Sequence, residues 1–96
     1  MTTIDPKQLF DLSRATLVEH GWVPNTIGNI LKHPDLPHAE TRVHYTGGQI
    51  FIHGWHTVNG EEQVWWGSGS KPVELIEYAR TIHKHLTEAE QQWQSN

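Results

Sequence analysis

The segment that decides the fold is residues 41–67, TRVHYTGGQIFIHGWHTVNGEEQVWWG. It contains two tight-turn signals, Gly47-Gly48 and Asn59-Gly60, each flanked by β-branched and aromatic residues. Two-residue turns of this composition are those that type I′ and II′ β-hairpins require. The segment therefore predicts a three-stranded antiparallel meander whose register is fixed outward from each turn.

Counting outward from the turns divides the meander into two faces. The register places Tyr45 opposite Ile50 and Val43 opposite Ile52 on a largely aliphatic face, which is the expected core side. The opposite face gathers a different set of residues: Arg42, His44, Phe51, His53, Trp55, Val64 and Trp66.

A helix is predicted on each side of the meander. Asp5, Pro6 and Gln8 form a capping-box start, and Gly21 is a typical helix stop, so the first helix should span about Pro6 to His20. After Pro72 a long amphipathic helix is indicated by one apolar stripe: Leu75, Tyr78, Ala79, Ile82, Leu86, Ala89 and Trp93. The expected architecture of the single domain 1–96 is α+β, in the order helix, three-stranded meander, helix, with both helices on one sheet face.

The segment 22–40 is the least regular part of the chain and is broken by three prolines. Asn25 could cap a short helical turn, because Ile27, Ile30 and Leu31 follow at helical spacing. Such a turn could fold across the aromatic sheet face. Whether this segment or a partner covers that face is left open by the sequence.

Composition narrows the possible functions. The 96 residues include no cysteine, which excludes disulfides and thiolate chemistry. The formal charge is −4, with 7 Lys and Arg against 11 Asp and Glu, which argues against nucleic-acid binding. No apolar run reaches the roughly 18–20 residues of a membrane span, and the start lacks a signal-peptide pattern, so a cytoplasmic location and no membrane partner are expected.

The aromatic face predicts a protein-binding surface. If the face were left bare, three aromatic side chains at about 150–250 Å² each would equal or exceed the largest apolar patch of a typical monomer, which is about 300–600 Å². The predicted partner-binding residues are Phe51, Trp55, Val64, Trp66, Arg42 and His53. We expect a small non-enzymatic interaction module, an inhibitor or adaptor of the phage or mobile-element type, that binds a protein partner or forms a homodimer.

The 8 histidines raise an alternative. His83 and His85 are two apart on a helix and diverge, whereas His53 and His56 point to opposite faces of a strand. Only His44 and His53 converge, as diagonal neighbours on the aromatic face, and no third ligand is evident. No cofactor, catalytic triad or metal motif is predicted, and the alternative is a histidine-dependent metal-binding or hydrolytic protein around His44 and His53.

The stretches Glu19-His20-Gly21-Trp22 and Lys32-His33-Pro34-Asp35, with the helix–meander–helix order, resemble double-stranded-RNA-binding-like toxin domains of bacterial toxin–antitoxin pairs. The chain lacks the Gly-Ser-His-His stretch of that family. The resemblance therefore implies no activity for this chain.

Overall fold

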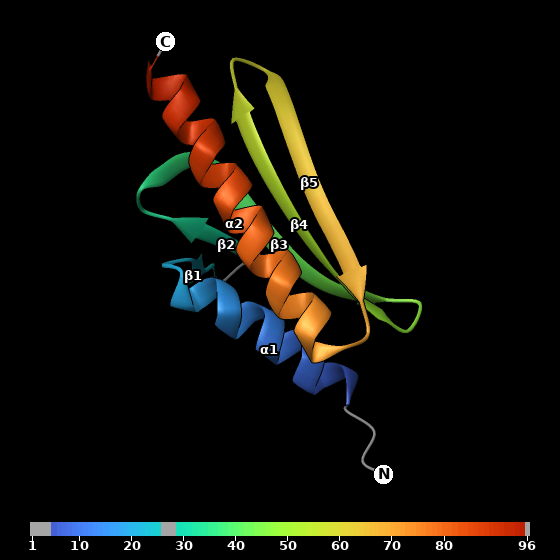
Figure 1. Ribbon diagram of the computed structural model, residues 1–96. Coiled ribbons are helices and arrows are strands. Elements are labelled where there is room, and N and C mark those ends of the chain that lie inside the picture. The colour runs from blue at the N-terminus through green and yellow to red at the C-terminus, as the bar shows by residue number, and fades with distance from the viewer. Residues whose placement is uncertain (1–4, 26–28, 96) are drawn as a thin grey trace.

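The computed structural model describes residues 5–25 and 29–95. The elements, in chain order, are α1 (Pro6–Glu19), β1 (Val23–Pro24), β2 (Ile30–His33), β3 (Leu36–Thr46), β4 (Gln49–Val58), β5 (Glu61–Gly69) and α2 (Pro72–Ser95). The strands form one antiparallel sheet in the order β1-β2-β3-β4-β5, so each strand pairs with its neighbour in sequence (Figure 1).

The predicted meander is confirmed together with its register. Tyr45 pairs with Ile50 and Val43 with Ile52 between β3 and β4. Between β4 and β5, His53 pairs with Trp66. The second turn needs its glycine because Gly60 has a φ of 81°, a left-handed conformation that other residues seldom adopt.

The sheet has five strands, so the prediction of three strands was wrong in number. β3 begins at Leu36, and β1 and β2 extend the sheet beyond it. The predicted helical turn is wrong, because Ile30 and Leu31 lie in β2; Ile27 lies outside the described residues. Leu31 is buried and the following Lys32 is exposed, so the apolar spacing that suited a helix belongs to a strand with one buried face.

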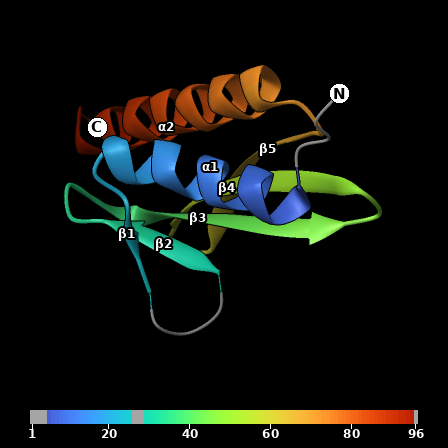
Figure 2. The same ribbon diagram turned by 90° about the horizontal axis from the view of Figure 1, so that it is seen from below.

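Both helices lie on the same face of the sheet, as expected, and Figure 2 shows them together on one side of the strands. The aliphatic sheet face is covered by Leu9 and Leu17 of α1 and by four residues of α2, all of which are buried. The residues of this core are Leu9, Leu17, Trp22, Leu31, Leu36, Ala39, Val43, Ile50, Ile52, Leu75, Ala79, Ile82 and Leu86. In the described part of the chain, neither helix has the length and apolarity that crossing a membrane demands.

The start of α1 forms as predicted. Asp5 caps the helix by accepting a hydrogen bond from the Lys7 backbone at 3.0 Å, and the Gln8 side chain accepts from the Asp5 backbone at 3.2 Å. The helix ends at Glu19 with His20 as its C-cap, one residue earlier than the sequence suggested. Gly21 follows with a φ of 97°, which explains why the helix stops there.

Two glycines on the core face of the sheet allow α2 to approach closely. A Cβ atom at Gly54 in β4 would lie 2.5 Å from Cγ2 of Ile82 and 2.9 Å from Cδ1 of Leu86. A Cβ at Gly67 in β5 would lie 2.5 Å from the ring of Tyr78. The side chains of α2 therefore occupy the space that any larger residue in these strands would need.

We predict that Gly54→Ala destabilises the protein by roughly 1–3 kcal/mol, the usual cost of adding a methyl group to a packed core. Urea unfolding followed by circular dichroism measures this cost. Gly69→Ala in β5 is the matched control, because the nearest atom to its new Cβ is 3.4 Å away. Equal stability of the two variants would contradict the close packing of α2 on Gly54.

Candidate functional site

The sheet face opposite the helices carries all the residues that were predicted to bind a partner. Register places Arg42, His53 and Trp66 in one row across β3, β4 and β5, and Trp55 and Val64 in the next. We call the following seven residues the aromatic outer face: Arg42, His44, Phe51, His53, Trp55, Val64 and Trp66. Neither helix lies over this face (Figure 2).

Five rings of the aromatic outer face form a continuous array. His44 stacks on Phe51 with centroids 5.3 Å apart and planes 6° from parallel, and it stacks on His53 at 4.9 Å. His53 stacks in turn on Trp55 at 5.6 Å, and Phe51 lies 6.2 Å from Trp66. The side chains support one another laterally, which holds the surface in one arrangement before any partner binds.

The array is open to solvent in the described part of the chain. Trp66 is 63% exposed and Val64 is 45% exposed. The described residues of the segment 22–40, which are 22–25 and 29–40, do not lie across them. These residues supply β1, β2 and the start of β3, which widen the sheet instead of covering it.

The aromatic outer face carries little charge, although it contains polar side chains. Burial, together with the neighbouring His44 and Arg42, lowers the pKa of His53 below its ordinary value. His53 is consequently neutral near pH 7, whereas the Arg42 guanidinium stays charged. A neutral imidazole beside two indoles favours contact with another apolar surface.

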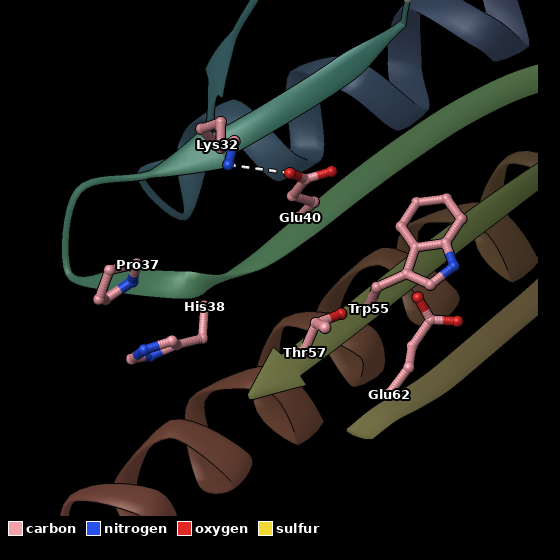
Figure 3. Close-up of a pocket in the computed structure, with 7 residues that line it drawn as sticks. All are labelled: Lys32, Pro37, His38, Glu40, Trp55, Thr57 and Glu62. Atoms are coloured by element: carbon pink, nitrogen blue, oxygen red, sulfur yellow. Dashed lines mark ion pairs between the residues drawn. The ribbon is translucent and has the colours of Figure 1, made fainter. Parts of the chain in front are cut away.

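A hollow of ≈ 440 Å³ lies at one end of this face, beside Trp55 (Figure 3). Lys32 and Glu40 form an ion pair of 2.9 Å along one side of it, and Glu62 stands on the other side. The hollow is therefore polar at its margins, in contrast to the ring array next to it.

The predicted histidine pair is close but does not form a three-ligand site. The rings of His44 and His53 stack at 4.9 Å, and no third potential ligand joins them within residues 5–25 and 29–95. The described residues place a different group of potential ligands together: His38, His56 and Glu90. Each offers one ligand atom, and these atoms lie within 4.8 Å of one another.

Glu90 is a buried carboxylate between two imidazoles. Its side chain is 3% exposed, and Oε2 lies 3.0 Å from Nδ1 of His38. The His38 backbone N–H donates to Oε1 at 3.3 Å. Burial raises the pKa of Glu90, but the hydrogen bonds from His38 and the positive charge that His38 and His56 can carry lower it by more, so the pKa falls below its ordinary value.

A second histidine cluster lies where α1 ends beside α2 and β2. The rings of His20 and His83 stack at 4.8 Å, and His33 lies 5.8 Å from His83. The indole N–H of Trp22, which is 1% exposed, donates to Nδ1 of His83 at 3.0 Å. Burial, followed by the nearby His20 and His33, lowers the pKa of His83.

Sequence reasoning missed both of these histidine clusters. One available signal was Glu90, which lies four residues after Leu86 and so falls on the apolar stripe of α2. An acidic residue in a buried stripe requires a partner. That partner, His38, lies 52 residues away, in the segment whose strand structure was not recognised.

Comparisons with known proteins add no further information about the site. No family model matches the chain, no curated protein matches it, and no solved structure matches its fold.

We predict that acidification destabilises the protein through His83. Its folded-state pKa lies below the value of about 6.5 for an unfolded histidine, so the unfolded state binds the proton more readily. This contribution to stability is complete above about pH 6.5 and is lost as the pH falls through the lowered folded-state pKa. The urea concentration at the midpoint of unfolding should therefore decrease as the pH is lowered from 7.5 to 5.

His83→Asn is the informative variant for this test. The Asn side-chain oxygen can still accept the Trp22 indole N–H but does not titrate. The variant should lose less stability on acidification than the wild type, although the lowered pKa of His53 leaves a remaining dependence of the same sign. An identical loss in both proteins would exclude His83 as the source.

Proposed function

We propose that this protein is a non-enzymatic protein-interaction module that binds through its aromatic outer face, and that the occupant of this face is a second copy of the chain. The observation that carries the proposal is the ordered array of rings on an uncovered sheet face, with Trp66 63% exposed at its edge. Exposed Trp side chains and Arg are the residues that most often dominate the energy of protein interfaces.

The exposed side chains of the aromatic outer face are those that a protein partner could cover. A stable interface buries about 800 Å² on each side. Phe51, His53 and Trp55 are already partly buried within the chain, so the area that a partner would newly cover comes chiefly from Trp66, Val64 and Arg42, which are exposed. An interface of standard size would therefore extend beyond the aromatic outer face onto neighbouring exposed residues.

The arrangement of charge favours a second copy. Arg42 lies on β3, at one side of the array, and the exposed Trp66 lies on β5, at the other side of the same row. A two-fold axis that runs parallel to β4, midway between the two facing sheets, would place β3 of one copy over β5 of the other. Arg42 of each copy would then face the indole of Trp66 in its partner, which is a favourable cation–π pairing.

The proposed pairing also follows the usual geometry of stacked sheets. Two sheets that pack face to face align their strands within about 30° and lie about 10 Å apart, with side chains interdigitating. The resulting dimer would have four layers, with helices outside and two sheets inside. The apolar face that water otherwise contacts would become the centre of the assembly.

Light scattering of the full chain tests this proposal. We expect a mass twice the 11.0 kDa of the chain for the wild type. Trp66→Lys should give monomers at the same concentration, because an ammonium group would replace the apolar ring that faces Arg42 of the partner copy. Trp55→Ala combined with Trp66→Ala should have the same effect.

Trp93→Ala is the matched control. Trp93 is 40% exposed but lies on α2, away from the sheet face, so its loss should leave the mass unchanged. Unfolding of Trp55→Ala/Trp66→Ala would show that the face is part of the core, and Trp66→Lys then decides the question because its side chain is largely in solvent. A wild-type monomer would overturn the second-copy proposal and would point to a different protein as the occupant.

The remaining expectations from the sequence stay predictions. They are the inhibitor or adaptor role, the cytoplasmic location and the alternative metal or hydrolytic site at His44 and His53. Stacking of these two imidazoles supports their role as part of the apolar array instead of as ligands.

A further inference from the structure

We propose that His38, His56 and Glu90 form a binding site for a divalent transition-metal ion such as Zn²⁺. The three residues come from the start of β3, the last residues of β4 and the last turns of α2. His56 and Glu90 lie on the helix side of the sheet, and His38 reaches Glu90 from the start of β3. The ligand atoms are therefore separate from the rings of the aromatic outer face, and the site does not depend on the proposed interface.

The ligand set is chemically appropriate. Two imidazoles and one carboxylate bind zinc in hydrolytic enzymes and iron in many oxygenases, with the remaining positions open to water or other ligands. A tetrahedral ion with bonds near 2.0 Å separates its ligand atoms by about 3.3 Å. Here, Oε1 of Glu90 lies 3.2 Å from Nδ1 of His38 and 3.5 Å from Nε2 of His56, and the three ligand atoms all lie within 4.8 Å of one another.

An independent observation concerns His56, which is 6% exposed. Its Nε2 atom faces Glu90 but makes no hydrogen bond to any described residue. A buried imidazole nitrogen without a partner costs free energy. A metal ion between His56 and Glu90 would satisfy this nitrogen and offset the buried negative charge at the same time.

The ion has a route to the site. The His38 side chain is 35% exposed, and its ring packs edge-on against Trp93 at 5.8 Å. A hollow of ≈ 320 Å³ borders His56 and Trp93 and has polar residues, among them Gln63 and Gln92, along its margin. The open coordination position of the ion would face this hollow, where water could complete the coordination.

Zinc titration of protein prepared without a histidine tag tests the proposal. Isothermal calorimetry should show one Zn²⁺ bound per chain, with a rise in the unfolding temperature. His38→Ala should weaken binding by at least about tenfold, the lower end of losses found even for residues that only support a ligand. Glu90→Gln, which keeps the side-chain shape, should weaken binding similarly, and circular dichroism of both variants checks that they remain folded.

His44→Ala and His20→Ala are the matched controls, since each removes a histidine from another cluster. Both should bind Zn²⁺ as the wild type does. The absence of Zn²⁺ binding by the folded wild type would overturn the proposal and leave His38 and Glu90 as a structural ion pair. Binding that survives His38→Ala and Glu90→Gln, or that is lost in His44→Ala or His20→Ala, would equally overturn it by placing the ion elsewhere.

Discussion

The structure depends on the close packing of α2 against β4 and β5. Gly54 and Gly67 leave room for Ile82, Leu86 and Tyr78 to reach the strand backbones, and this contact fixes which sheet face becomes the core. The two helices together cover only that face. A sheet with apolar side chains on both faces and helices on one therefore presents the second face to its surroundings, and the array of rings there follows from this asymmetry.

Local sequence signals were sufficient to predict the strands on either side of the tight turns. The glycine-containing turns fixed the register of β3, β4 and β5, and with it the membership of the aromatic outer face. They could not reveal β1 and β2, because the β2–β3 connection at Pro34-Asp35 has no glycine, and Ile30 and Leu31 fit helical spacing as well as strand spacing. The extra strands are stabilised by pairing with β3, which is a tertiary effect that a short window of sequence does not contain.

Histidine chemistry was predicted least well for a related reason. His44 and His53 were recognised as neighbours because both lie in the meander. The clusters around Glu90 and His83 each join a residue of α2 to residues much earlier in the chain, and their side chains come together only when α2 lies along the sheet. The same helix packing that buries the aliphatic face therefore also assembles the buried polar groups.

His38 connects the two proposed sites. It lies at the start of β3, where it hydrogen-bonds Glu90 on the helix side and also borders the hollow next to Trp55. Contacts from the backbone and the side chain of His38 to Glu90 hold this end of β3 in place. A buried carboxylate on the helix side therefore stabilises the strand end that borders the aromatic outer face. A metal ion bound there would stiffen that end of the strand while leaving the rings of the array unchanged, because His44, Phe51 and His53 lie further along the sheet.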